Sequence, residues 1–156
     1  MVIRRAAEGD IEGLHKLLEQ VNLIHHRGRP DLFRCGTCKY TDEELRELIA
    51  DDDRPILAAV EGDRVEGYAF CIYQRHPDDN ILTDIKTLYI DDLCVDEHLR
   101  GRHIGKQLYE AVLQLARETG CYNVTLNVWC LNEGAMRFYE QCGMKPLKIA
   151  MEQIIE

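Results

Sequence analysis

A basic bend with two glycines is the stretch of this sequence best suited to chemistry. It lies between residues typical of a β-strand and a segment whose apolar residues recur at helical spacing. No Ser, Thr, Asp or Asn precedes the expected helix, so its first backbone N–H groups lack a side-chain partner. Together with the helix dipole and the basic side chains, they would suit a phosphate or pyrophosphate, although an ordinary solvated strand-to-helix turn has the same spacing. The bend consists of Arg100, Gly101, Arg102, His103, Ile104, Gly105 and Lys106.

A pair of adjacent carboxylates is the second candidate. Asp91 and Asp92 lie inside an otherwise apolar segment. Such a pair is costly to bury unless it is hydrogen-bonded, partly protonated or functional. Because neighbours in a strand point to opposite faces, we expect only one of the two to face a cleft.

A Cys-x-x-Cys motif at Cys35 and Cys38 follows the pair His25 and His26. A zinc site needs four ligands and usually shows a second paired motif, which this sequence lacks apart from the histidines. Metal or redox function at the motif is therefore one interpretation and an incidental loop is the other. We expect most of the seven cysteines to be reduced apolar residues of the core.

The elements that must position these residues alternate along one domain, residues 1–156. Residues 22–40 are polar, contain glycine and proline, and are expected to form a long loop or broken helix. Helices are expected to begin at Asp10, at a capping box on Thr41, after the basic bend, and at Asn132. Strands are expected at residues 2–5, 55–60, 65–73, 86–95, 124–129 and 148–155.

Composition narrows the classes of partner. The net charge is −9, from 19 basic and 28 acidic residues, which argues against nucleic acid and mildly favours cationic substrates. No apolar run approaches the roughly 20 residues of a membrane span, and the N-terminus lacks the apolar core of a signal peptide. We therefore expect a cytoplasmic protein without a membrane or nucleic-acid partner.

Two stretches resemble the GNAT superfamily of acyl-CoA-dependent N-acyltransferases. The bend resembles motif A, Gln/Arg-x-x-Gly-x-Gly/Ala, with Arg100 opening it, Gly105 closing it and His103 standing where the first glycine belongs. Residues 132–144 resemble motif B, Asn-x-x-Ala-x-x-Phe-Tyr-x-x-x-Gly-Phe, with Met144 as the only change. The resemblance covers nearly the whole chain. It implies a single-domain α/β GNAT fold, a mixed and mostly antiparallel sheet flanked by helices.

The resemblance also implies an acetyl-CoA site and no metal. Tyr139 would act as the general acid near the thioester sulfur. The backbone of the triplet before motif A would pair with the pantetheine arm and direct one N–H at the thioester oxygen. Asn132 would contact the cofactor as well as cap its helix. The implied cofactor residues are Leu93, Cys94, Val95, Arg100, Gly101, Arg102, His103, Ile104, Gly105, Lys106, Asn132 and Tyr139.

The acceptor side follows from the same resemblance. The diamine N-acetyltransferase branch has an acidic pair before its triplet, and the position of its first member, which faces the amine, corresponds to Asp91. His25, His26 and Phe33 are candidates for substrate contact. We expect direct acetyl transfer to a primary amine, either a small amine or polyamine or a protein amino group, by an enzyme that forms a homodimer. A non-catalytic acyl-CoA sensor and a Cys-x-x-Cys metal or redox protein are the alternatives.

Overall fold

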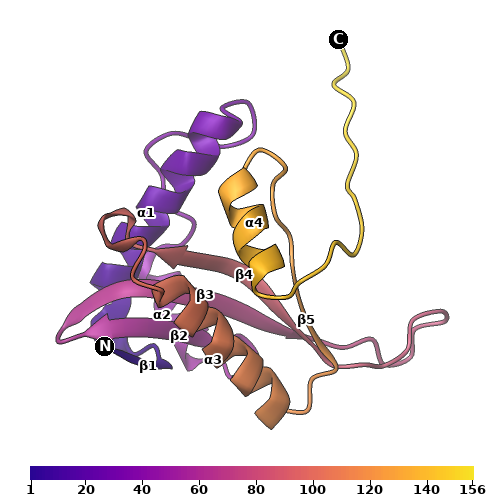
Figure 1. The fold of residues 1–156 in the computed structure, drawn as a ribbon, viewed down its shortest axis with the longest axis horizontal. Coiled ribbons are helices and arrows are strands. Elements are labelled where there is room, and N and C mark those ends of the chain that lie inside the picture. The colour runs from indigo at the N-terminus through magenta and orange to yellow at the C-terminus, as the bar shows by residue number, and fades with distance from the viewer.

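A sheet of five strands runs through the middle of the computed structural model, which describes residues 1–156 (Figure 1). The strands lie in chain order across the sheet. The first three pairings are antiparallel, and the last, between β4 and β5, is parallel. The strands are β1 (Val2–Arg5), β2 (Ile56–Glu61), β3 (Arg64–Gln74), β4 (Thr87–Val95) and β5 (Asn123–Leu126). The expected mixed, mostly antiparallel sheet is confirmed.

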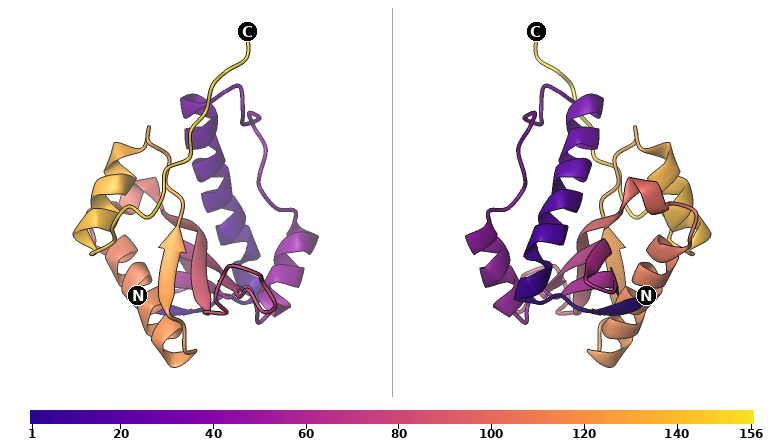
Figure 2. Two further views of the ribbon diagram at one scale, coloured as in Figure 1. Left: turned by 90° about the vertical axis from the view of Figure 1, so that its right-hand side faces the viewer. Right: turned by 90° about the vertical axis from the view of Figure 1, so that its left-hand side faces the viewer.

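Helices cover both faces of this sheet, as Figure 2 shows. The helices are α1 (Ile11–Gly28), α2 (Asp42–Ala50), α3 (Ile104–Glu118) and α4 (Glu133–Gln141). Because strand side chains alternate between faces, β2 contributes Ala58 and Val60 to the apolar core under α1 and α2, and Leu57 and Ala59 to the core under α3. None of the helices combines the length and the apolar character that crossing a bilayer requires.

The alternation of β4 is interrupted at its acidic pair. Phe70 of β3 pairs with Asp92, whereas the next residue, Cys71, pairs with Ile90. Asp91 is therefore the extra residue of a β-bulge. The side chains after it point to the opposite faces from those that an unbroken alternation would give. Ile90 belongs to the core under α3, and Asp92 shares the opposite face with Phe70.

Three expectations about the elements were wrong. Helix α1 continues to Gly28, so His25 and His26 lie on its last turns and the loop begins only at Arg29. The Asp10 carboxylate does not cap α1; it accepts two hydrogen bonds from the Arg4 guanidinium, at 2.7 and 3.0 Å, and one from Ala7 N–H. The strand expected at residues 148–155 does not form, and β5 ends at Leu126.

Candidate functional site

The start of α3 has the uncapped geometry that the sequence predicted. His103 occupies the N-cap position, and no side chain accepts a hydrogen bond there. Its φ of 60° and ψ of 18° are left-handed, as expected where motif A usually has glycine, and Gly101 before it has a φ of +86°. No acidic residue lies in the first turn. The first N–H groups of the helix therefore remain available to an anion.

Basic side chains surround this helix start. Arg102 lies 4.0 Å from Glu61, and Lys106 lies 4.0 Å from Glu110. Exposed ion pairs at this distance contribute little to stability, so both side chains are free to turn toward a phosphate. Gly105 affects the packing of the helices. A Cβ added there would lie 3.4 Å from the ring of Phe138, so this glycine allows α3 to approach α4 closely.

The end of β4 has one edge without a neighbouring strand. Pairing with β5 stops at Ile90 and Leu126, and on the other side Leu93, Cys94 and Val95 pair with β3. An extended chain can bind such an edge through backbone hydrogen bonds. An anion site at a helix start beside an open strand edge fits the two ends of acetyl-CoA, its diphosphate and its pantetheine arm.

Tyr139 of α4 packs against the same apolar core as Leu93 and Val95. Burial raises the pKa of its phenol, and the negative charge of Asp92 raises that pKa further. Its ring packs edge-on against Phe138, with centroids 5.1 Å apart. The phenol therefore remains protonated at neutral pH. Asn132 caps the same helix, because its Oδ1 accepts from the N–H of Ala135 at 3.1 Å.

The two carboxylates of β4 lie on the same face of the sheet. Asp91 Oδ2 accepts hydrogen bonds from Lys39 Nζ at 2.6 Å and from the Tyr40 hydroxyl at 3.3 Å, and Asp92 Oδ2 accepts one from the Tyr68 hydroxyl at 2.7 Å. Both tyrosine rings pack on Phe70, with centroids 5.7 and 4.8 Å away. The two side chains therefore do not point to opposite faces as expected, because the bulge breaks the alternation of the strand.

The pKa of the Asp92 carboxyl is shifted. Burial raises that pKa and the negative charge of Asp91 adds to the rise, while the hydrogen bond from Tyr68 and the positive charge of Lys39 oppose it. The charge of Asp92 in turn raises the pKa of the Tyr139 phenol.

An aromatic wall lies beside the end of α1. His25 stacks on Phe33 with centroids 4.8 Å apart, and Phe33 meets Trp129 edge-on at 5.7 Å. His26 Nδ1 lies 2.7 Å from the carbonyl oxygen of Phe33, and this contact ties the loop to α1. The wall joins the end of α1, the loop after it and the segment after β5. Of the four residues predicted to contact substrate, His25 and Phe33 belong to this wall, His26 contacts Phe33, and Asp91 lies on β4.

The Cys-x-x-Cys motif lies in the same loop, residues 29–41. Cys35 is exposed, Cys38 is half-buried against the core under α1, and both are free thiols. The structure assembles no group of three or more His, Cys, Asp and Glu side chains that could hold a metal ion.

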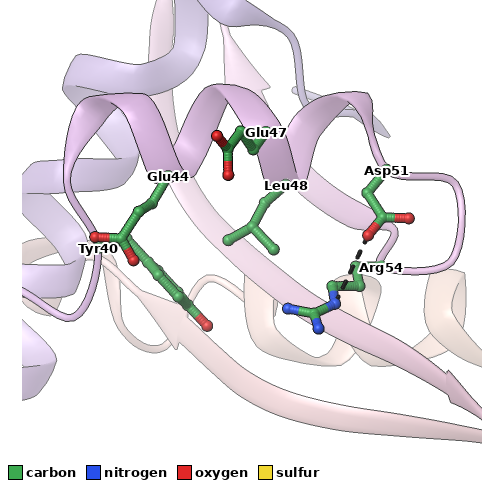
Figure 3. Close-up of a pocket in the computed structure, with 6 residues that line it drawn as sticks. All are labelled: Tyr40, Glu44, Glu47, Leu48, Asp51 and Arg54. Carbon is green, nitrogen blue, oxygen red and sulfur yellow. Dashed lines mark ion pairs between the residues drawn. The ribbon is translucent and has the colours of Figure 1, made fainter.

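A shallow groove of about 300 Å³ lies beside α2 (Figure 3). Asp51 and Arg54 form an ion pair of 3.7 Å at one end of it. Of its lining residues, only Tyr40 also contacts the acidic pair.

Four residues of the site were missed in the sequence: Lys39, Tyr40, Tyr68 and Trp129. Their roles depend on contacts between distant elements. Trp129 had the clearest signal, because it is the only tryptophan and ends an expected strand.

Comparison with known proteins agrees with this geometry. A family model described as Acetyltransferase (GNAT) family matches residues 23–144. Glucosamine 6-phosphate N-acetyltransferase of Arabidopsis thaliana is 35% identical over 71 residues, which is 46% of either chain, so the match spans less than half of that enzyme. Thialysine N-epsilon-acetyltransferase of Bos taurus is 25% identical over 94% of this chain and 85% of its own. A mutant protein of Bacillus halodurans has a matching structure, with a TM-score of 0.95, 29% identity and complete coverage of both chains.

The chain belongs to the GNAT acetyltransferase family. Its class is therefore that of an acyl-CoA-dependent N-acetyltransferase, and the family uses acetyl-CoA as the acyl donor.

Proposed function

We propose that this chain transfers an acetyl group directly from acetyl-CoA to the primary amine of a small molecule. The observation that carries this proposal is the acidic pair on one face of β4, next to the open strand edge and to Tyr139. Relatives named for glucosamine 6-phosphate, thialysine and spermine acetylation support a small amine as acceptor.

Acetyl-CoA supplies a thioester whose acetyl group can be transferred to an amine. The backbone N–H groups at the start of α3, with Arg100, Arg102 and Lys106, would bind its diphosphate. The open edge of Leu93–Val95 would hold the pantetheine arm and direct one N–H at the thioester oxygen. The backbone N–H groups of the helix and the strand are fixed before the donor binds, which is the arrangement that favours catalysis.

Two side chains have proton-transfer roles in this proposal. Tyr139 would donate its proton to the departing sulfur. Asp92, whose raised pKa brings it nearer to neutrality, would hold the acceptor ammonium and pass a proton to water. The pKa of a carboxylate stays far below that of an amine, so Asp92 would not hold the proton of the ammonium itself. It would relay that proton to water. Asp91, the carboxylate first expected in this role, is already engaged by Lys39.

Acceptor binding would involve the aromatic wall. His25, Phe33 and Trp129 would contact the body of the substrate, while His26 would hold the loop in place. Packing between aromatic faces suits a small organic amine.

The C-terminal residues 145–156 support a homodimer. They extend away from the sheet in Figures 1 and 2 and form no helix or strand, and Glu152 forms an ion pair with Arg29 at 2.8 Å. Leu147, Ile149 and Met151 alternate with polar or small residues and are 75%, 79% and 90% exposed. An amphipathic strand of this kind is stable only when paired. We infer that it pairs with a second copy of the chain.

A screen of amines tests the function, with release of the CoA thiol as the readout. We expect turnover by the wild type on small amines and a large loss of turnover in Tyr139→Phe and Asp92→Asn. Turnover on peptides alone would indicate a protein acceptor, and acetyl-CoA binding without thiol release on any amine would indicate a sensor. Loss in Asp91→Asn with full activity in Asp92→Asn would contradict the assignment of the carboxylates.

A further inference from the structure

The acidic pair of β4 already holds one ammonium group, which belongs to the chain itself. Lys39 Nζ lies 2.6 Å from Asp91 Oδ2, a charge-assisted hydrogen bond, and 5.5 Å from the centre of the Tyr40 ring. Burial lowers the pKa of Lys39, but the hydrogen bond and charge of Asp91 outweigh this, so the pKa is raised and the amine stays protonated.

The second carboxylate has no such partner. The hydrogen bond to Asp92 comes from the neutral hydroxyl of Tyr68, and no ion pair forms there. When both carboxylates are ionised, the pair carries two negative charges and Lys39 supplies one positive charge. One further positive charge would bring the net charge of this group of side chains to zero. An acceptor amine in its ammonium form would supply that charge at Asp92.

We propose that Lys39 determines the charge of the acceptor: it occupies the cation position at Asp91, so that the site accepts an amine with a single positive charge and disfavours diamines. This inference rests on the proposed function. Lys39 comes from the acceptor loop, residues 29–41, and its charge also acts on Asp92. A second ammonium that approached Asp91 would therefore meet the like charge of Lys39, which lies 2.6 Å from that carboxylate, and this is destabilising.

The test compares two acceptors of equal length that differ in one charge, 1-aminobutane and 1,4-diaminobutane. The quantity measured is the ratio of kcat/KM for the diamine to kcat/KM for the monoamine. In Lys39→Met we expect this ratio to rise at least tenfold over the wild type, since a neutral side chain leaves the position at Asp91 open to the second ammonium.

Two further variants serve as controls. Lys39→Arg retains the positive charge, and its ratio should stay within about threefold of the wild type. Arg46→Met removes one positive charge from an exposed position on α2, outside the site, and should leave the ratio unchanged. Thermal melting of each variant shows whether it is folded, and the ratio is insensitive to the fraction of active protein.

The outcomes separate this inference from the function on which it depends. If Lys39→Met changes kcat/KM for both acceptors by the same factor, or changes neither, Lys39 does not select charge and the inference is wrong while the transferase function stands. If the wild type releases no thiol with any amine, the proposed function fails as well.

Discussion

The left-handed backbone at His103 leads to a prediction about stability. A φ of 60° costs an L-residue about 1–2 kcal/mol, and histidine is among the residues that tolerate it best. Glycine removes that cost, but its greater freedom in the unfolded chain makes its folding about 0.5–1 kcal/mol less favourable than that of other residues. His103→Gly should therefore raise the free energy of unfolding by roughly 0.5–1 kcal/mol, or about 1–4 °C in Tm.

A reciprocal variant in the same bend provides the control. Gly101 has a φ of +86°, and a Cβ added there would meet no atom within 4 Å, so Gly101→Ala should destabilise through backbone strain alone, by about 1 kcal/mol. Urea denaturation measures both effects, with m-values expected to stay constant. Destabilisation by His103→Gly would refute the reasoning, because it would mean that the imidazole makes contacts worth more than the strain.

Four other predictions concern packing, catalysis, charge and assembly. Gly67→Ala should destabilise by about 1–3 kcal/mol in denaturation experiments, because its Cβ would lie 2.9 Å from the Cys94 carbonyl oxygen, whereas Gly9→Ala, with open space around it, should have little effect. Tyr139→Phe should lower kcat by about 10²–10⁴-fold while calorimetry shows unchanged acetyl-CoA affinity. The pKa of Asp92 is raised in the folded protein, so the free energy of unfolding of the wild type falls as pH rises from the ordinary carboxyl pKa to the raised one. Asparagine does not titrate, so the stability of Asp92→Asn relative to the wild type should increase over that pH range. Denaturation at several pH values measures this difference. Deleting residues 145–156 should convert a dimer to a monomer in analytical ultracentrifugation, and a full-length chain that is already monomeric would contradict the pairing of this segment with a second copy.

Local signals in the sequence were sufficient for most of the fold. Thr41 and Glu44 form the expected capping box, with reciprocal hydrogen bonds of 3.2 and 3.3 Å. The hairpin of β2 and β3 and the helix that follows the basic bend also appear where expected. Each of these depends on neighbouring residues, because caps, turns and apolar spacing act within a few positions of the chain.

The acidic pair shows where local reasoning fails. The bulge at Asp91 exists because β3 and β4 are out of step between Phe70 and Cys71, which is a property of two strands together. Likewise, the ion pair of Lys39 with Asp91 joins positions 52 residues apart. Alternation along one strand could not reveal either feature. The tail has the pattern of a strand, but a partner strand decides whether the pattern forms one.

The binding of acetyl-CoA at the start of α3 is the central claim, and calorimetric titration tests it most directly. Arg100→Glu combined with Lys106→Glu reverses charge at the proposed diphosphate site, whereas Arg117→Glu makes the same kind of change near the far end of the same helix. Glutamate at Gly105 would be a poorer test, since its Cβ would press on Phe138. We predict that the wild type and Arg117→Glu bind acetyl-CoA with similar affinity and that the double variant loses at least tenfold. Equal affinity in all three proteins, or no binding by the wild type, would contradict the account.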